Sequence, residues 1–216
     1  MRSRAALFAL AMLVLSLNPR SLSAYETGEI RGRYHSKEAL PSLAKLGKIS
    51  RVNPQSGIDP DLMITAAYFA YSESRLYAGI QTAGGGFPLS AALGTRRHGY
   101  FAVIANPDNE EIVWAMVYID AAVAGLSPGL YRVLGTGRKD LIRIGDIEYR
   151  LDEEDNLLVM SADLADLMAD PGFTEWYRPE DPQLSFVGSI TSTRILPYRT
   201  DTISSSYPGK ILRLAR

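Results

Sequence analysis

The sequence predicts a mostly β fold, an antiparallel β-sandwich of jelly-roll-like form with one short helix. Two observations support this prediction. From Leu62 onward, apolar segments of five to ten residues rich in Val, Ile and Tyr follow one another, separated by turn residues. The 3.6-residue spacing of apolar positions that marks helices is rarely sustained between them. Short β-rich segments bounded by turns are typical of antiparallel sheets.

The N-terminal residues predict a secretory signal peptide over residues 1–23. Arg2 and Arg4 precede an apolar run from Ala5 to Leu17, and Ser23 and Ala24 place small residues on both sides of a cleavage site. The apolar run is shorter than the about 20 residues that a membrane-spanning helix needs. We therefore expect an exported protein, periplasmic or extracellular, with no membrane span after the signal is removed.

Composition limits the class of partner. The chain has no cysteine, so its stability has to come from the core and not from disulfides. Cleavage after Ser23 removes three of the 23 basic residues and none of the 24 acidic ones, which leaves a formal net charge of −4. Binding to nucleic acid draws on a basic excess that releases counterions. We therefore expect no nucleic-acid partner.

The mature chain divides into an N-terminal extension over residues 24–58 and a β-sandwich domain over residues 59–216. The extension is polar, rich in Gly, Ser, Lys and Arg, and contains one short helical candidate, Lys37–Leu46. We expect a single domain after it, because a mature chain of about 190 residues suffices for one sizeable core.

One segment allows two interpretations, and the fold class depends on the choice. Asp59–Asp61 supplies a cap, a first-turn proline and a first-turn acid, which favours a helix. The aromatic segment Ala66–Tyr71, the polar segment Ser72–Arg75 and the apolar segment Leu76–Thr82 favour a β-hairpin. We predict the hairpin, and a continuous helix over Leu62–Ala78 is the alternative.

A second hairpin is predicted between Tyr100 and Ile119. The strands Tyr100–Ala105 and Ile112–Ile119 flank Asn106–Asn109, where Pro107 pre-sets the backbone angle of a type I turn. In the second strand, apolar residues fill both alternating sets of positions. A strand that is apolar on both faces is typical of the middle of a sheet. We therefore place this strand at the centre of the core.

The remaining elements are shorter. Ser161 can cap a short helix over Ser161–Met168, which ends before Asp170-Pro171-Gly172. A charged hairpin tip is predicted at Asp152–Asn156. The further predicted strands are Leu130–Leu134, Leu141–Ile144, Ile147–Leu151, Leu157–Met160, Leu184–Ile195 and Ile211–Leu214.

A pattern of aromatics and turns carries a resemblance to a known family. It runs through Asp61-Leu62, Tyr68, Tyr71, Leu76-Tyr77, Ile80, the Tyr100–Ile119 hairpin, Asn156-Leu157-Leu158 and Ser161-Ala162-Asp163-Leu164. Over about residues 55–195, the chain resembles the exported β-sandwiches described as DOMON-like or family-nine carbohydrate-binding-like domains. The resemblance implies a jelly-roll-like double sheet that binds a sugar or, in some relatives, a haem.

No catalytic residue is predicted. Gly125–Gly129 has the spacing of a nucleophile elbow around Ser127, but Pro128 has no backbone N–H to offer an oxyanion hole. That arrangement also needs a downstream histidine, and His35 and His98 both lie upstream. Two histidines without cysteine supply no common zinc site, and we expect no cofactor. An enzyme of another type stays open as an alternative.

Two loop clusters are the candidates for binding. Trp176 and Tyr177 lie in a proline-rich charged segment, where an exposed aromatic pair is typical of a contact surface. Arg96, Arg97 and His98 form a compact basic cluster before a strand, which suits an anionic sugar or an acidic partner. We predict a non-enzymatic module that uses them to bind carbohydrate or cell-envelope material. Core packing and solvated loops are the alternative explanations.

Two other functions are kept as alternatives. His98 together with Met63, Met116 or Met160 would provide axial ligands for haem in an electron-transfer domain. Methionines on apolar strands are more simply explained as residues that fill core gaps. The other alternative is a structural or assembly partner in an envelope complex. The patterns predict no oligomeric state.

Overall fold

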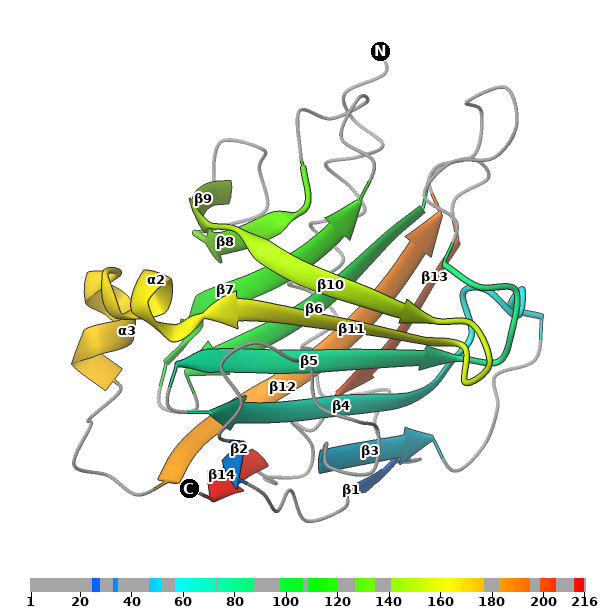
Figure 1. The fold of residues 1–216 in the computed structure, drawn as a ribbon, viewed down its shortest axis with the longest axis horizontal. Helices are drawn as coiled ribbons and strands as arrows, with labels where there is room; N and C mark the ends of the chain where they lie inside the picture. The colour runs from blue at the N-terminus through cyan, green and yellow to red at the C-terminus, as the bar shows by residue number, and fades with distance from the viewer. Residues whose placement is uncertain are drawn as a thin grey trace.

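The computed structural model is a sandwich of two β-sheets, which confirms the predicted fold class (Figure 1). Strands make up most of the described chain, and the few helices are short. The structure describes residues 25–27, 33–34, 47–51, 57–72, 74–87, 98–106, 109–119, 127–134, 141–176, 183–194, 199–204 and 212–215.

Sheet A contains seven strands within the described residues. Their bounds are β1 Tyr25–Thr27, β2 Arg33–Tyr34, β3 Gly47–Arg51, β4 Ile64–Ser72, β5 Arg75–Thr82, β10 Ile147–Asp152 and β11 Leu157–Asp163. The strand order is β1-β3-β4-β5-β11-β10, all antiparallel, and the short β2 runs parallel to β4. The first three strands come from the predicted N-terminal extension, which therefore contributes to the sheet.

Sheet B also contains seven strands within the described residues. Their bounds are β6 His98–Asn106, β7 Asn109–Ile119, β8 Gly129–Val133, β9 Leu141–Gly145, β12 Gln183–Arg194, β13 Arg199–Ser204 and β14 Leu212–Ala215. The order is β13-β12-β6-β7-β8-β9, with β14 beside β12. All of these pairs are antiparallel.

The pairing of β4 with β5 decides between the predicted hairpin and the alternative helix. The two strands are antiparallel, with Ala67 opposite Ile80. The hairpin is therefore confirmed and the continuous helix is wrong. The helix-start signal at Asp59 produces only a turn, in which its carbonyl accepts the N–H groups of Leu62 and Met63. Alternating apolar positions then make the following strand more favourable than a helix, because one set of them faces the other sheet.

The second predicted hairpin is also confirmed. β6 and β7 pair antiparallel, with Tyr100 opposite Tyr118 and Ile104 opposite Trp114. β7 lies between β6 and β8, and its side chains from Val113 to Ile119 are buried on both faces, as predicted for a central strand. The turn residues 107–108 lie outside the described residues.

The main core lies between the inner faces of the two sheets. Its centre is Trp114, which is completely buried and packs edge-on against Phe173 with ring centroids 5.1 Å apart. Other members from the strands are Ile64, Ala67, Phe69, Leu76, Ala78, Ile80, Tyr100, Ala102, Ile104, Met116, Tyr118, Leu130, Leu158, Met160 and Ala162. Burial of this apolar surface on both sheets is the main force that holds the layers together.

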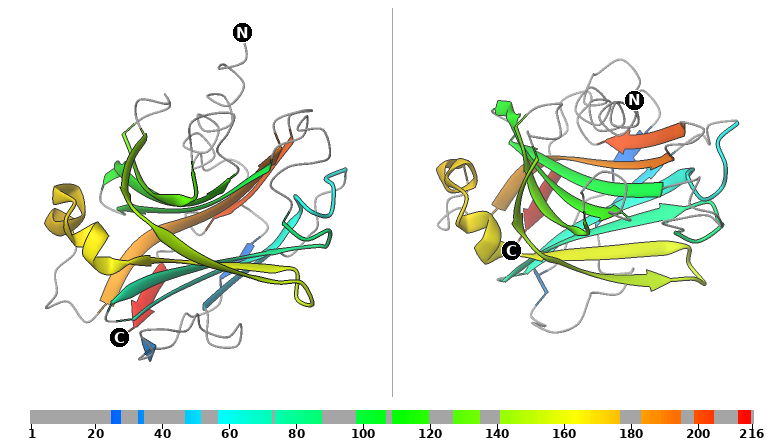
Figure 2. Two further views of the ribbon diagram at one scale, coloured as in Figure 1. Left: turned by 45° about the horizontal axis from the view of Figure 1, so that its top comes forward. Right: turned by 90° about the horizontal axis from the view of Figure 1, so that it is seen from above.

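Two short helices, α2 (Leu164–Met168) and α3 (Pro171–Trp176), cover one end of the sandwich (Figure 2). The buried side chains Leu167 and Phe173 attach them to the core. Arg132 of β8 donates a hydrogen bond to Asp170 between the helices at 2.9 Å. This end of the sandwich is therefore closed by both apolar and ionic contacts.

The predicted helix near Ser161–Met168 is confirmed, but the predicted cap at Ser161 is wrong. Ser161 lies within β11, opposite Tyr77 of β5. The helix starts after Asp163, whose side chain makes no capping hydrogen bond. Strand pairing continues as far as Asp163 because Arg75 lies opposite and donates a hydrogen bond to its carboxylate at 3.1 Å.

The outer faces of both sheets also carry buried apolar side chains. On sheet A they are Ala66, Tyr68, Tyr77, Leu157 and Val159. On sheet B they are Phe101, Val103, Ala105, Val113, Ala115, Val117, Ile119, Tyr131 and Val133. The Tyr68 hydroxyl donates to the Gln81 side chain at 2.8 Å. Burial, with a smaller contribution from Asp155, raises the pKa of Tyr68 to about 12.

Buried polar contacts attach the turn before β4 to sheet B, at the end opposite the helices. Asp201 of β13 is 3% exposed, and its Oδ2 accepts the N–H of Ile64 at 2.8 Å. The Ser192 hydroxyl of β12 donates to the carbonyl of Leu62. These contacts join residues more than 100 positions apart in the chain, so they fix how the two sheets are placed at this end.

Replacing Asp201 with Ala is predicted to lower the free energy of unfolding by about 1 to 3 kcal/mol, because the buried N–H of Ile64 then has lost its acceptor. Urea unfolding followed by circular dichroism measures the change. Asp146→Ala is the matched control, because that carboxylate is 87% exposed and its ion pair with Arg143 is worth little. Equal stability of the two variants would contradict the structural role of Asp201.

Tyr68 is predicted to make stability fall at alkaline pH. The unfolded phenol loses its proton near pH 10, whereas the folded one keeps it until about 12. Between these values the folded state binds the additional proton, so its stability decreases as pH rises. Below pH 10 the contribution is fully present. The free energy of unfolding, measured by urea unfolding at several pH values in this window, is expected to fall less with pH in Tyr68→Phe than in the wild type. An equal fall in both proteins would contradict the prediction.

Candidate functional site

The exposed large apolar side chains of the described residues come from one short stretch of chain. Leu134, Ile142, Tyr149 and Leu151 are 53%, 46%, 49% and 41% exposed. Ile142, Tyr149 and Leu151 lie on β9 and β10, the last strands of sheets B and A, and Leu134 directly follows β8. We use the name open edge for Tyr149 and Leu151 of β10 together with Tyr118 of β7.

The open edge forms because the chain passes from one sheet to the other between β9 and β10. Gly145 ends β9 and Asp146 precedes β10, so the two strands follow each other in sequence but do not pair. A side chain at Gly145 would collide with Asp166 of α2, its Cβ lying 2.6 Å from the Asp166 Cγ. The chain is therefore tightly packed against α2 at Gly145, whereas Asp146 is exposed and forms a surface ion pair with Arg143.

Tyr149 and Leu151 occupy positions that belong to the inner face of sheet A. Tyr149 lies opposite Met160, and Leu151 lies opposite Leu158. Directly opposed residues point to the same side of a sheet, and both Met160 and Leu158 are completely buried core residues. The exposure of Tyr149 and Leu151 therefore means that the core covers β10 at Ile147 but leaves the inner face of the rest of this strand partly open.

A row of aromatic side chains leads from the core to this edge. The ring centroids of Phe87 and Tyr100 are 4.9 Å apart, and those of Tyr100 and Tyr118 are 6.3 Å apart. The Tyr118 and Tyr149 rings are 4.7 Å apart and tilted by 52°. The first three rings are buried and only Tyr149 is half exposed. The exposed Tyr149 ring thus packs on the buried Tyr118 ring on its core side.

Across sheet B, the aromatic row is aligned with the buried polar residues Ser192 and Asp201. Asp201 lies opposite Ser192, Ser192 opposite Tyr100, and Tyr100 opposite Tyr118. Burial raises the pKa of Tyr118, and its neighbour Tyr149 adds to the shift. Burial also raises the pKa of Tyr100 well above its usual value. Both phenols therefore stay protonated and able to donate hydrogen bonds over the whole physiological pH range.

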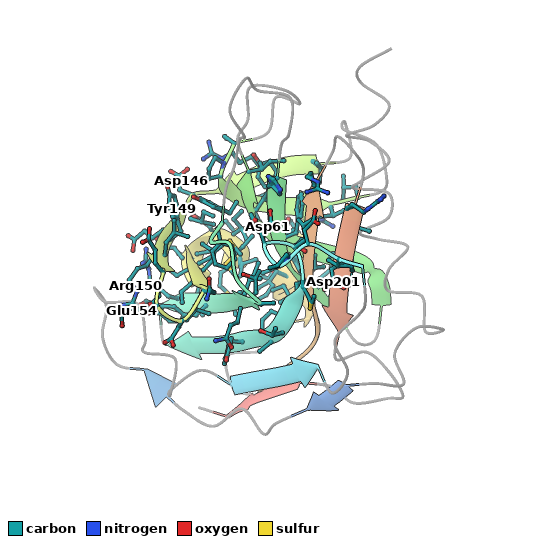
Figure 3. The ribbon with its side chains drawn as sticks, turned by 90° about the vertical axis from the view of Figure 1, so that its right-hand side faces the viewer. Asp61, Asp146, Tyr149, Arg150, Glu154 and Asp201 are labelled. Carbon is teal, nitrogen blue, oxygen red and sulfur yellow. The ribbon has the colours of Figure 1, made fainter. Side chains whose placement is uncertain are left out.

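Charged side chains accompany the open edge. Arg75 of β5 forms ion pairs with Glu148 and Asp163, and its hydrogen bond lowers the pKa of Glu148, which therefore stays ionised. Arg150 is exposed and forms no ion pair with any described residue. Figure 3 shows Arg150 and Glu154 on the same side of the molecule as Tyr149, away from Asp61 and Asp201.

His98, one of the predicted site residues, lies in the buried polar contacts and not in an exposed loop. It is 3% exposed, and its Nε2 lies 3.0 Å from an Asp61 carboxylate oxygen. The Tyr100 hydroxyl donates to the Asp61 carbonyl at 3.3 Å, and Arg194 forms an ion pair with Asp59 next to it. These contacts make His98 a residue that fastens the turn before β4.

The other predicted site residues are not brought together with His98. Trp176 is the last residue of α3, at the helical end of the sandwich, where Leu164 donates its N–H to the Ser74 carbonyl. His98 lies at the opposite end, where β4 begins. Arg96, Arg97 and Tyr177 lie outside the described residues. Trp176 and His98 therefore belong to different regions of the fold.

Sequence reasoning missed Tyr149 and Leu151. The signal was present in residues 147–152, where Ile, Tyr and Leu alternate with Glu, Arg and Asp. Such alternation predicts a strand with one apolar and one polar face. It does not say whether the apolar face is covered, because this depends on how far the opposite sheet extends.

No protein-family model, no curated protein sequence and no solved structure matches this chain. Within the described residues, no group of three or more His, Cys, Asp or Glu side chains is placed to hold a metal ion. None of the described helices has the length and apolar character to cross a membrane. The open edge is therefore the best-defined candidate site in the described chain.

Proposed function

We propose that this protein is an exported, non-enzymatic module that binds carbohydrate or other cell-envelope material at the open edge. The observation that carries the proposal is Tyr149, an inner-face ring that is 49% exposed and packs on the buried Tyr118. Export rests on the predicted signal peptide over residues 1–23. The sugar class rests on the chemistry of the exposed ring and its charged neighbours.

A supported tyrosine ring suits the apolar face of a sugar. Aromatic side chains bury large areas when they are covered, and a pyranose presents a flat C–H face that can stack on them. Tyr118 lies behind Tyr149 with ring centroids 4.7 Å apart, which restricts the exposed ring before any ligand arrives. Tyrosine loses little conformational entropy when it becomes a contact, because it has only two side-chain torsions.

Polar groups around the ring suit the hydroxyl groups of a sugar. Asp146 and Glu154 are exposed beyond the two ends of β10, on the side of the molecule where Tyr149 lies (Figure 3), whereas Arg150 belongs to the other face of the sheet. Hydrogen bonds that involve a charged partner are roughly twice as strong as neutral ones. An aromatic centre with a charged rim is the usual composition of a specific binding surface.

The contacts of His98 do not favour the haem alternative. A haem ligand needs an imidazole nitrogen directed at the iron, and the Nε2 of His98 lies against Asp61. Met116 and Met160 are at most 1% exposed and pack in the core between the sheets. Reconstitution with haem is expected to give no Soret band.

The binding test is a pull-down of the purified protein on insoluble polysaccharides and purified cell-wall material. Tyr149→Ala is expected to weaken binding about tenfold or more, because the central aromatic contact is lost. Tyr149→Phe keeps the ring and is expected to bind like the wild type. Leu134→Ala is the matched control, because it removes another exposed apolar side chain.

Two outcomes would contradict the open edge as the site. One is unchanged binding by Tyr149→Ala when its thermal melt shows a folded protein. The other is loss of binding in Trp176→Ala but not in Tyr149→Ala, which would place the site at the helical end. Absence of binding by the wild type to every material in the panel would contradict the proposed function itself.

A further inference from the structure

Strand β10 has an edge with no partner among the described strands, and its sequence is self-complementary. It is the last strand of sheet A and pairs only with β11 among the described strands. Residues 147–152 read Ile-Glu-Tyr-Arg-Leu-Asp. The apolar members belong to the inner face and the charged members to the outer face, since each strand alternates sides. A free edge of this kind is a template for pairing with another strand.

We propose that two copies of this chain pair through β10, antiparallel and centred on Tyr149, so that sheet A continues from one copy into the other. In this register Ile147 lies opposite Leu151 of the second copy, and Glu148 lies opposite Arg150. Tyr149 lies opposite its own counterpart. The two-fold symmetry repeats each unlike pair, so the interface contains two Glu148–Arg150 pairs.

Charge selects this register over its neighbours. A shift of the centre to Glu148 or to Arg150 would place two identical charges directly opposite each other, which is destabilising. A slip by one position would set an inner-face residue against an outer-face residue. Only Asp146 and Asp152 meet as like charges in the proposed register. They lie at its two ends, and Asp146 already has Arg143 as a partner.

In the single chain, the side chains of Glu148 and Arg150 are exposed and can therefore contact a second copy. Glu148 is 62% exposed at its side chain while it contacts Arg75. Arg150 is exposed and has no ion pair within the described chain. In the pair of copies, Glu148 would lie between Arg75 of its own chain and Arg150 of the other. Asp163, the other partner of Arg75, balances the second guanidinium group, so the charges on the outer face of the joint cancel.

The proposed pairing also completes the binding site, in so far as the proposed function holds. The Cβ atoms of directly opposed residues are about 5 Å apart, so the two Tyr149 rings would stand side by side. Each ring keeps its own Tyr118 behind it. The second copy thus turns a single ring into a platform of two rings. Such a platform can contact successive units of an oligosaccharide, whereas a single ring contacts one sugar unit.

Sedimentation of the purified chain tests the pairing. The wild type is expected to sediment as a dimer. Arg150→Glu and Glu148→Arg are each expected to be monomeric, because each creates two like-charged pairs. An equimolar mixture of the two variants is expected to form a heterodimer, since both facing pairs of positions 148 and 150 are then of opposite sign. Glu154→Arg is the control, a charge reversal at the exposed hairpin tip outside the register, and is expected to stay dimeric.

Thermal melts establish that each variant is folded, and the mixture keeps the test informative even if one variant is less stable. A monomeric wild type at every soluble concentration would overturn the inference, as would a mixture that fails to pair or a β10 edge found occupied by a different protein. Glycan binding by a monomer that depends on Tyr149 would leave the proposed function intact. A dimer that binds no glycan would remove the proposed function and leave the pairing.

Discussion

The structure depends on the burial of two apolar sheet faces against each other, and the site exists where that burial ends. Trp114, Tyr100 and Met116 of sheet B face Phe69, Ile80 and Met160 of sheet A in one continuous core. Along β10, the last strand of sheet A, this cover includes Ile147 but leaves Tyr149 and Leu151 partly exposed. Tyr149 and Leu151 therefore have apolar inner-face side chains like those of the core, but they remain in contact with water. Covering them with a ligand or partner would be favoured by the hydrophobic effect.

Within the described residues, both ends of the sandwich are held by other contacts, and exposed large apolar side chains of β10 lie at the strand edge. At one end, Phe173 packs on Trp114, and Asp170 accepts a hydrogen bond from Arg132. At the other end, Asp201 accepts the N–H of Ile64 and His98 contacts Asp61. These buried polar contacts are costly to break singly, because each leaves a group without its partner. They hold the sheets in a fixed relation, which in turn fixes Tyr149 against Tyr118.

Local patterns in the sequence were sufficient for most strands, but not for the site. The hairpin at β4 and β5 and the central position of β7 follow from alternation and turn residues close in sequence. The predicted cap at Ser161 is wrong because pairing with β5 extends β11 to Asp163, a non-local effect. His98 looked like part of an exposed basic cluster, and only its contact with Asp61 reveals a buried role. Tyr149 needed knowledge of where the cover of β10 ends, which no local pattern contains.

The charges on β10 bear on whether its edge is protected or available. Proteins commonly guard edge strands with lysines, prolines or charges that repel a second strand. Edge charges of a single sign would repel an identical copy, because a two-fold axis brings the same set of charges from both copies together. β10 instead carries Glu148 and Arg150 on either side of Tyr149, so each charge meets its opposite when the strand meets itself. The charges on the outer face of β10 therefore disfavour pairing with a strand of uniform charge and favour antiparallel pairing with a second β10. This is expected of a specific dimer interface and not of an edge that is protected against pairing.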